Sequence, residues 1–484
     1  MNLSVSLSFA VIGLCAVIYR VLQIGKWDPR MPKGPPTIPV LGNAHMLPTT
    51  GLYKKMKEWT KTYGPVFSLK IGPSNMVVLC DRKAIHQLLV EKGSIYSDRP
   101  PSYVGKLLTQ GDHLALEQMD ATWREKRKII SHNFSPKQLD ENHFRLQEAE
   151  ATVLMSSLCN NPDNFYREIR RYTASVITSI TYRCRAQTSD SSWCNGVYNV
   201  MDKGKARRRV KERRAKGEKR RCIIDTLLDE YEKKGWPSSI PQHAFTNLLG
   251  GIIEGGADTT AAQLLTLILA FALYPEVQTK ARKEIDAVCG TERSPRWNDF
   301  AKLPYVNCIV KEGMRWRPVA VTALPHKVRQ DDMYQGMLIP KDSTIFIPTW
   351  AIHHSENIYE DPETFNPDRY TQHPRLANDY AGSPDWANRD HYNYGAGRQI
   401  CPGIHLAERN MWRIASKLLW AFEFAEPGDP KTGEVIHLDP EAYNPGILQA
   451  PLPFKVSIKP RSEAHVATIL REHKGSLEFL SQYS

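Results

Sequence analysis

Hydrophobic residues are grouped along this chain in patterns that predict mostly helices. Between Leu3 and Ile24 every residue is apolar or small except Arg20 and Gln23. Two short β-like runs, "VFSLKIG" and "NMVVLC", lie between Val66 and Cys80. Apolar residues then recur with a helical period over Asp120 to His132, Phe165 to Tyr182, Ala244 to Leu273, Glu276 to Val288 and Pro402 to Phe424. The pattern predicts one large, mainly α domain with a small β-rich part near its start.

The first apolar run is long enough to cross a membrane. As a helix it spans a bilayer core of about 30 Å. The basic residues Lys26, Arg30 and Lys33 follow the run, whereas a cleaved signal peptide has its basic region before the apolar run. We therefore expect residues 1–25 to be an uncleaved anchor, with the following domain on the cytoplasmic side of the membrane.

Residues 26–43 separate this anchor from the globular part. They include "MPKGPPTIPVLGN", which is too rich in proline and glycine to form a helix or a central strand. Residues 44–484 are expected to form one domain. The stretch "AAQLLTLILAFAL" within it is too short for a second span, and extending it backward adds Glu254 and Asp258. Each carboxylate would cost at least about 2.5 kcal/mol in mid-membrane, so a buried core helix is predicted.

Composition and charge exclude several classes of protein. The chain has nine cysteines but no CxxC pair, which disfavours a disulfide framework or a zinc site. Its net charge of +12 comes mostly from the segment between Lys203 and Arg221, which holds twelve Lys or Arg and two Glu. We interpret this segment as a solvated helix or linker. Two alternatives are a nucleic-acid site and a site for an acidic membrane surface. Nucleic-acid binding is disfavoured because no aromatic residues interleave with the basic ones.

The loop "YGAGRQICPG", Tyr394 to Gly403, surrounds one cysteine with three glycines and a proline. The glycines allow positive φ and close approach of a bulky group, and Pro402 suits the first turn of a helix. Cys401 is thus expected at a helix N-terminus, where the dipole lowers a thiol pKa. Such a thiolate suits a soft metal, or a nucleophile with His405 as base, and a structural cysteine is the third reading. The loop alone leaves the choice open.

This loop resembles the haem-binding loop of cytochrome P450, F-x-x-G-x-R-x-C-x-G. Four further segments stand in the order of that family: "WREKR" from Trp123, "GGADTT" from Gly255, "EGMR" from Glu312 and "FNPDRY" from Phe365. The resemblance covers roughly Pro32 to Pro460 and is strongest for members from secondary metabolism of filamentous fungi. It implies a cytochrome P450 fold, mainly α with a small β-rich subdomain, behind an N-terminal transmembrane helix.

The resemblance also assigns roles to single residues. It implies that the Cys401 thiolate is the axial ligand of the iron in haem b, where it favours O–O cleavage. Asp258 and Thr259 would be catalytic, as a proton relay beside small residues that leave room for dioxygen. The other residues implied to contact the cofactor are Trp123, Arg127, His326, Gly397, Arg398, Gln399 and Gly403. Glu312, Arg315 and Arg369 would form a buried ion network with an architectural role.

Two features depart from the pattern of the family. Gln399 stands where the family has an arginine that contacts a haem propionate, and Arg398 is displaced by one position. Because an amide carries no charge, we expect weakened but not abolished haem retention. Tyr394 in place of Phe is a milder change. The lid region around residues 190–221 is short as well, so either the lid is reduced or the sequence lacks a segment, as a mis-spliced gene would.

The implied activity is that of a membrane-anchored monooxygenase. Electrons would come from NADPH through NADPH–cytochrome P450 reductase, and one oxygen atom would enter an apolar small molecule, an aromatic polyketide in the first place and a terpenoid or alkaloid in the second. The protein would be a single-pass protein of the endoplasmic reticulum. One alternative is a reductase-independent isomerase or dehydratase, although these commonly lose the threonine present as Thr259. The other is a haem-poor inactive homologue that binds a partner or membrane through its basic segment. The pocket would be lined by parts of Pro100 to Gln118, Leu248 to Thr259, Val319 to Leu324 and Asn444 to Gln449.

Overall fold

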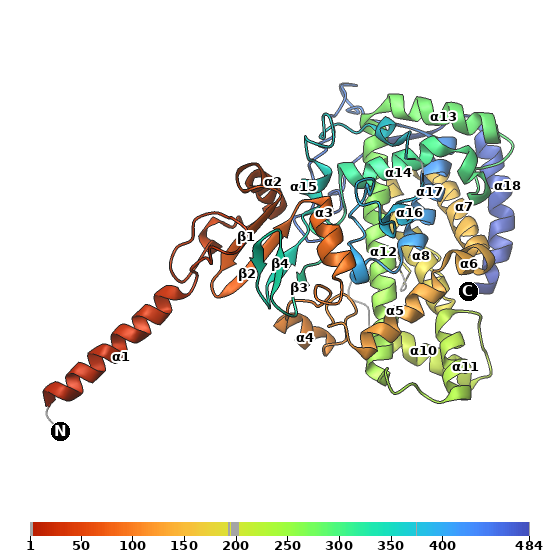
Figure 1. The fold of residues 1–484 in the computed structure, drawn as a ribbon. Helices are drawn as coiled ribbons and strands as arrows, with labels where there is room; N and C mark the ends of the chain where they lie inside the picture. Colours follow the sequence, from red (N-terminus) through yellow and green to blue (C-terminus); the bar gives the residue numbers. More distant parts are fainter. Residues whose placement is uncertain (1–2, 192–193, 195–202, 374, 484) are drawn as a thin grey trace. The chain divides into compact units, whose positions relative to one another are not determined.

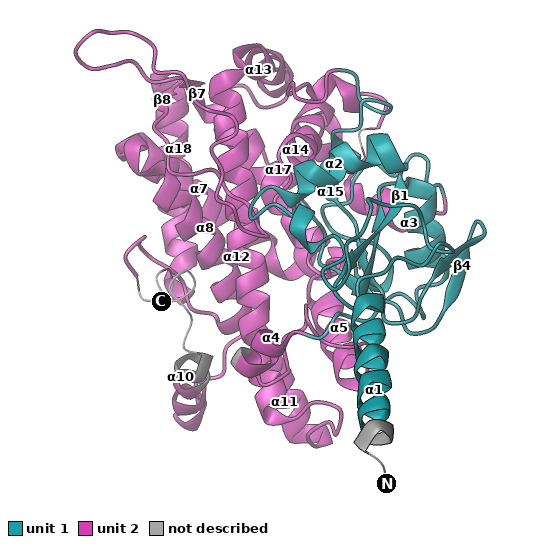
Figure 2. Ribbon diagram, turned by 90° about the vertical axis from the view of Figure 1, so that its left-hand side faces the viewer, with its two compact units in different colours: residues 1–101, 320–360, 385–400 teal, residues 102–319, 361–384, 401–484 magenta. Residues whose placement is uncertain are grey.

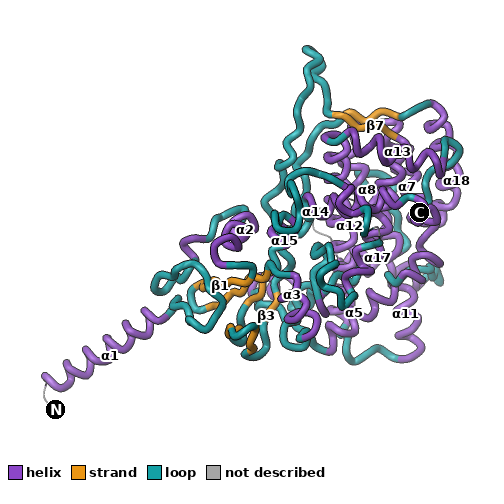
Figure 3. The backbone as a smooth tube through the Cα atoms, turned by 45° about the horizontal axis from the view of Figure 1, so that its top comes forward, coloured by secondary structure: helices purple, strands orange, loops and turns teal. Residues whose placement is uncertain are grey.

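The computed structural model describes residues 3–191, 194, 203–373 and 375–483. The chain divides into two compact units (Figure 2). Unit 1 consists of Met1–Pro101, Ala320–Glu360 and Asp385–Ile400, and unit 2 of Ser102–Val319, Asp361–Pro384 and Cys401–Ser484. Helices make up most of the described chain and the strands are short (Figure 3). The predicted fold class, mainly α with a small β-rich part, is confirmed.

Unit 1 contains the larger sheet and the N-terminal helix. Its elements are α1 (Leu3–Gln23), η1 (Ala44–Met46), α2 (Leu52–Tyr63), β1 (Val66–Ile71), β2 (Ser74–Leu79), α3 (Arg82–Ile85), η2 (His86–Glu91), β3 (His326–Lys327), β4 (Asp332–Tyr334), β5 (Met337–Ile339), β6 (Thr344–Phe346), α15 (Thr349–His353) and η7 (Gly397–Gln399). From Leu7 on, the apolar side chains of α1 are mostly exposed. This short apolar helix is consistent with a membrane anchor.

The sheet of unit 1 joins strands that are far apart in the sequence. Its strand order is β1-β2-β6-β3, with β1 antiparallel to β2 and β6 parallel to β2. Residues alternate between its two faces: Phe67 and Leu69 pack with Trp59 of α2, whereas Val77 packs with Ile345 in a second cluster. The sheet therefore has a buried core on each side, and α2 supplies one of them.

Unit 2 is mainly helical. Its elements are α4 (Tyr103–Thr109), α5 (Ala121–Asn133), α6 (Pro136–Gln138), η3 (Leu139–His143), α7 (Phe144–Asn160), η4 (Pro162–Asn164), α8 (Phe165–Tyr182), α10 (Lys203–Ala215), α11 (Ile223–Lys234), α12 (Gln242–Leu273), α13 (Pro275–Cys289), η5 (Trp297–Lys302), α14 (Pro304–Trp316), η6 (Pro367–Tyr370), α16 (Ala377–Ala381), α17 (Ile404–Ala421), β7 (Phe422–Ala425), β8 (Ser457–Pro460), α18 (Glu463–Leu480) and η8 (Ser481–Tyr483). The helices predicted near 120–132, 165–182, 244–273 and 276–288 are α5, α8, α12 and α13.

Helix α12 runs through unit 2 and packs against α8, α14 and α17 (Figure 1). Among the described residues it is the one helix long and apolar enough to cross a membrane, yet 78% of its most apolar window is buried inside the protein. Its apolar residues surround the helix because neighbouring helices cover it on several sides. The prediction of a buried core helix rather than a second span agrees with this burial.

The helix predicted from Pro402 to Phe424 is shorter than expected. It begins at Ile404 and ends at Ala421, and the next four residues form strand β7. Phe422 pairs with Pro460 and Phe424 with Ile458, antiparallel. The apolar helical period of the sequence therefore extends beyond the helix itself, because the backbone after Ala421 pairs with the distant strand β8 instead.

The basic segment between Lys203 and Arg221 forms α10 and the turn after it. The expectation of a solvated helix or linker was incomplete, because Arg213 and Arg214 bind Asp225 at 2.7 and 3.1 Å. Arg214 also contacts Asp229 at 2.8 Å. These ion pairs fix the end of α10 to the acidic first turn of α11. The predicted short lid around 190–221 includes residues 192–193 and 195–202, which lie outside the described residues.

Candidate functional site

The cysteine loop begins in unit 1 with two glycines in the left-handed region. Gly395 has φ +73° and Gly397 has φ +62°. A Cβ on Gly397 would lie 1.9 Å from the carbonyl oxygen of Leu89, so this backbone approach requires glycine. Gly403 differs from the expectation, because its φ is −95° and it caps α17. The nearest atom to a Cβ there is the Cys401 Sγ at 3.9 Å, so its small size leaves the thiol uncovered.

Cys401 lies three residues before α17, as the sequence predicts, but its pKa does not follow the prediction. Burial raises the pKa of the thiol, and the Gly403 N–H and Arg127 oppose this only in part. The charged groups that act on His405 are Arg409, Asp379 and Asp140 rather than the thiol. A thiol with a raised pKa is a poor nucleophile, whereas a metal ion deprotonates its thiol ligand outright. The site favours metal ligation.

Helix α5 supplies the indole N–H of Trp123 and the guanidinium of Arg127, which acts electrostatically on Cys401. Asp120 caps the helix by accepting from the Trp123 N–H at 2.8 Å, and Trp123 and Arg127 share a face one turn apart. The Arg127 guanidinium lies 5.4 Å from the Trp123 ring centroid, and burial lowers its pKa while Cys401 raises it. The indole Nε1 of Trp123 is buried, and no acceptor for it lies among the described residues. A half-buried cation and a buried N–H donor together suit an anion such as a haem propionate.

In unit 1, the buried Gln399 contacts a buried arginine. The Gln399 Nε2 donates to the Ser97 carbonyl at 2.8 Å, and its Oε1 lies 3.4 Å from the Arg99 Nη2. Arg99 is 4% exposed and its Nη1 donates to the carbonyls of Leu324 at 2.7 Å and Pro325 at 2.9 Å. The fold therefore places a guanidinium beside the position where the family pattern has its own arginine.

Sequence reasoning missed Arg99. It stands in "YSDRPP" with no motif around it, and the one available signal was the charge missing at position 399. Arg398, the displaced arginine, is exposed, so it does not take the buried place next to it. His326 is buried and its Nδ1 donates to the Tyr96 carbonyl at 2.8 Å. Burial lowers the pKa of His326 to about 3, so the ring is neutral at physiological pH and its Nε2 holds a carboxylate only after taking up a proton.

Asp258 and Thr259 lie on α12 in unit 2. The Thr259 hydroxyl donates to the Gly255 carbonyl at 2.7 Å, and the Asp258 carboxylate, 51% exposed, lies 3.6 Å from the Arg170 guanidinium. The small residues next to them do not all leave open space as expected. A Cβ on Gly256 would lie 2.7 Å from a side-chain carbon of Ile177 on α8, whereas Gly255 faces open space.

A cavity of about 230 Å³ adjoins Asp258 in unit 2. It is lined by Tyr166 and Arg170 of α8, by Asp258 and Ala262 of α12, and by residues between Asn444 and Pro453. The structure thus brings the predicted relay residue together with Asn444 and Gln449 from one of the predicted pocket segments. Such a mixture of apolar residues with a few polar groups is typical of a small-molecule site.

The predicted ion network is assembled in unit 2. Glu312 and Arg315 of α14 are both fully buried and form two contacts of 2.7 Å. Arg369 lies 3.5 Å from Glu312, and the Asn366 N–H donates to the same carboxylate at 2.8 Å. Arg315 also donates to the Pro362 carbonyl at 2.7 Å. The network joins α14 to the segment around η6.

Comparison with known proteins identifies the family. The profile of the family "Cytochrome P450" matches residues 32–203 and 193–458. The cytochrome P450 monooxygenase yanC of Aspergillus niger is 38% identical, with 99% of this chain and 98% of the relative covered. The monooxygenase macC of Penicillium terrestre is 38% identical, with 98% of each chain covered, and patI of Aspergillus clavatus is 37% identical, with 99% of this chain and 98% of the relative covered.

A solved structure has the same fold. The structure of a zebra fish cytochrome P450 with abiraterone matches with a TM-score of 0.69 and 22% identity, covering 85% of this chain and all of the other. At that identity the match concerns the fold alone. The profile and the full-length fungal relatives go further: this chain belongs to the cytochrome P450 family and is a cytochrome P450 monooxygenase.

Proposed function

We propose that this chain uses haem b, bound through Cys401, to insert one atom of dioxygen into an apolar small molecule, most simply as a hydroxylation in a fungal secondary-metabolite pathway. One observation carries the haem assignment. Trp123 Nε1 and the Arg127 guanidinium lie partly or fully buried in the same unit as Cys401, with no carboxylate partner for either among the described residues. A haem propionate would satisfy both. By resemblance to relatives from fungal secondary metabolism, we propose an aromatic polyketide as substrate first and a terpenoid or alkaloid second.

Residues of unit 1 are proposed for the same cofactor. His326, Arg99 and Gln399 offer a histidine, a guanidinium and an amide from buried positions. Gly397 lets the loop approach the Leu89 carbonyl, and Gly403, in unit 2, has no side chain beside the Cys401 thiol. Because Arg99 supplies a positive charge beside Gln399, we expect the glutamine to weaken haem retention less than the loss of an arginine would suggest.

When bound, haem supplies the one-electron chemistry toward dioxygen that side chains lack. The protein residues would manage protons. The carboxylate of Asp258 is half-exposed, so solvent reaches it, and Arg170, 3.6 Å away, would orient it. The Thr259 hydroxyl already donates its hydrogen to the Gly255 carbonyl, so its oxygen would accept a hydrogen bond from a further donor. The ion network of Glu312, Arg315 and Arg369 would stabilise the fold and take no part in the reaction.

Membership of the family supports a proposal for partners and location. We propose that electrons come from NADPH through NADPH–cytochrome P450 reductase, and that α1 holds the protein in the endoplasmic reticulum membrane with the catalytic part in the cytoplasm. The exposed apolar side chains of α1, such as Phe9 and Leu14, support membrane insertion. We assign no nucleic-acid partner to the basic segment.

We also propose that the lid around 190–221 is shortened. The two matched stretches of the family profile overlap at residues 193–203, and the alignment with yanC extends over 535 positions although this chain has 484 residues. The relative therefore has residues with no counterpart here. Sequencing the mature transcript tests the proposal: a longer open reading frame at this point would overturn it.

A carbon monoxide difference spectrum of the reduced, purified protein tests the haem assignment. The expected result is the red-shifted Soret band of a thiolate-ligated haem, lost in Cys401→Ala and retained in Cys159→Ala, a control at a half-buried cysteine of α7. Absence of the band from the unaltered protein would favour a haem-poor homologue. Product formation without NADPH and reductase would instead favour an isomerase or dehydratase.

A further inference from the structure

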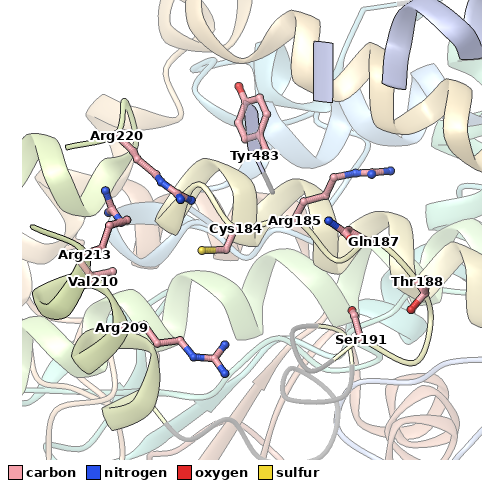
Figure 4. Close-up of a pocket in the computed structure, with 10 residues that line it drawn as sticks. All are labelled: Cys184, Arg185, Gln187, Thr188, Ser191, Arg209, Val210, Arg213, Arg220 and Tyr483. Atoms are coloured by element: carbon pink, nitrogen blue, oxygen red, sulfur yellow. The ribbon is translucent and has the colours of Figure 1, made fainter. Parts of the chain in front are cut away.

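A second, larger cavity of unit 2 lies away from Cys401 and Asp258. Its volume is about 450 Å³, within the range of about 300–1,000 Å³ that small-molecule sites occupy. Three parts of the unit form it: the segment after α8, helix α10 with the turn that follows, and η8 at the C-terminal end. Figure 4 shows the side chains that line it. Nothing in the proposed oxygenase chemistry uses this cavity.

The lining of the cavity is strongly basic. Four of its ten residues are arginines, and none of the ten, all of them described residues, is Asp or Glu. The arginines are Arg185 after α8, Arg209 and Arg213 on α10, and Arg220 beyond it. Arg209, Arg213 and Arg220 belong to the basic segment between Lys203 and Arg221, and the fold adds Arg185 from the segment after α8.

Contacts outside the cavity hold three of these arginines in place. Arg213 binds Asp225 at 2.7 Å and donates to the Glu218 carbonyl at 2.7 Å. Arg185 forms an ion pair with the buried Glu150. Arg220 donates to the Arg183 carbonyl at 3.0 Å. Guanidiniums fixed in this way lose little conformational entropy when they bind a ligand.

The carboxylates that bind these arginines lie outside the lining of the cavity. Asp225 is shared by Arg213 and Arg214, and Arg214 also binds Asp229. Glu150 is shared by Arg185 and Arg171, and Arg171 also binds Glu168. The carboxylate of Glu218 lies 3.9 Å from Arg220, at the limit of an ion pair, and is itself exposed. Among the described residues, the lining itself therefore presents arginines and no carboxylate.

Cys184 belongs to the lining, and these arginines influence the pKa of its thiol. Burial raises its pKa, whereas Arg220, Arg213 and Arg209 each act to lower it. These three guanidiniums are therefore close enough to influence one thiol, and Figure 4 shows the sulfur of Cys184 pointing to the side on which Arg213 and Arg220 lie. Several guanidiniums around one cavity suit phosphate groups, because each planar fork donates two N–H groups to phosphate oxygens.

We propose that this cavity binds a phosphate-bearing anion of small-molecule size. The cavity has room for an organic group as well as a phosphate, and it offers the Tyr483 ring and the hydroxyls of Thr188 and Ser191 besides the arginines. The same chemistry is found in soluble phosphate compounds and in the headgroups of anionic phospholipids. The experiment below separates these two sources.

The test uses the full-length chain in detergent with inorganic pyrophosphate as the soluble probe. Binding is measured by calorimetry, and alkylation of Cys184 by iodoacetamide is measured by peptide mass spectrometry, with the exposed Cys15 as internal reference. We expect pyrophosphate to slow alkylation of Cys184 several-fold and to leave Cys15 unchanged. The variant Arg209→Gln/Arg220→Gln is expected to bind about tenfold more weakly or worse.

A charge-matched control is available nearby. Lys211 and Lys216 are exposed and do not line the cavity, so Lys211→Gln/Lys216→Gln removes the same charge without touching the site. This control is expected to bind as the unaltered chain does. Equal weakening of both double variants would overturn the proposal, since attraction would then be general. Arg209→Gln alone, at an exposed side chain, gives the same comparison if the double variant does not fold.

The lipid source is tested with the chain in vesicles of phosphatidylcholine alone and of phosphatidylcholine with an equal part of phosphatidic acid. Protection of Cys184 only in the anionic vesicles would assign the site to a lipid headgroup. Protection by pyrophosphate in detergent would assign it to a soluble phosphate compound. If neither probe protects Cys184, the proposal is wrong.

Discussion

The guanidinium of Arg99 lies 3.4 Å from the amide oxygen of Gln399, inside unit 1 and out of reach of bulk solvent. The two residues are 300 positions apart in the sequence. Their contact means that the uncharged residue at 399 does not leave this part of the fold without a cation. Arg99 carries the positive charge instead, and its guanidinium is held by hydrogen bonds to the carbonyls of Leu324 and Pro325.

Replacing Arg99 with glutamine should therefore lower haem occupancy more than replacing Gln399 with alanine does. The same change should lower the free energy of unfolding by about 1–3 kcal/mol, since two buried carbonyls lose a charged donor. The haem-to-protein ratio and a denaturant titration measure the two effects. Arg329→Gln is the matched control, because Arg329 belongs to the same unit but pairs with Asp98 at its surface. Equal haem ratios in R99Q and R329Q would contradict the role given to Arg99.

Restoring the family residue, Gln399→Arg, should have opposite effects with and without haem. Without haem it brings a second buried guanidinium next to Arg99, which costs roughly 2–4 kcal/mol by like-charge repulsion. With haem bound, both cations have a carboxylate to bind, so haem should dissociate more slowly than from the unaltered chain. Denaturant unfolding of the haem-free protein measures the expected loss of stability, and the rate of haem transfer to apomyoglobin measures the expected slower dissociation of haem. Slower unfolding in both states would rule out this explanation.

Local patterns were enough to predict the helices that position the site. The apolar period located α5, α8, α12 and α13, and the loop motif located Cys401 three residues before α17. These features depend on residues close together in sequence, because helix periodicity and caps are local properties.

Features that depend on distant residues could not be predicted in the same way. Strand β6 enters the sheet beside β2 from more than 260 positions away, and its three residues carry almost no pattern of their own. The cation at Arg99 and the ion pairs of Arg213 with Asp225 likewise arise from partners that only the fold brings together. Gly256 resembled a residue that leaves space in a pocket, but its neighbour Ile177 uses that space for packing.

Substitutions of Asp258 and Arg170 should impair proton delivery to different extents. Asp258→Asn should lower coupled product formation about 100-fold, since an amide cannot take up and release a proton as a carboxyl group does. Arg170→Gln should lower it about fivefold at most, because an exposed ion pair contributes about 1 kcal/mol or less. The measurement is product formed per NADPH consumed, with the reductase in excess, together with the solvent isotope effect on the rate.

Glu254 provides the control for that experiment. It is an exposed carboxylate one turn earlier on α12 and contacts His113 at 3.2 Å. Glu254→Gln should leave the yield per NADPH and the isotope effect as they are in the unaltered chain. A loss in E254Q as large as in D258N would show that general negative charge on α12, and not the carboxylate of Asp258, supports the reaction.

Glu408, on the helix that follows the cysteine loop, should make stability depend on pH. Burial raises its pKa to about 7, against the N–H groups of Ala377 and Asn378 that act to lower it. The folded state therefore holds a proton that the unfolded chain releases near its ordinary pKa of 4.5. This contribution to stability is complete below pH 4.5 and is lost as the pH rises through 7, by about 3 kcal/mol in total.

The variant Glu408→Gln isolates this effect, because its amide stays neutral throughout and its oxygen still accepts the backbone N–H of Ala377. The free energy of unfolding of the unaltered chain minus that of E408Q should therefore fall as the pH rises from 4.5 to 7, and stay constant above that range. Urea titrations at several pH values measure the difference. Glu434, fully solvated at the surface, offers a control, since E434Q should give a difference that does not change over the same range. A difference that instead rises with pH would mean that the folded state stabilises the carboxylate, and that the N–H donors of α16 outweigh burial at this position.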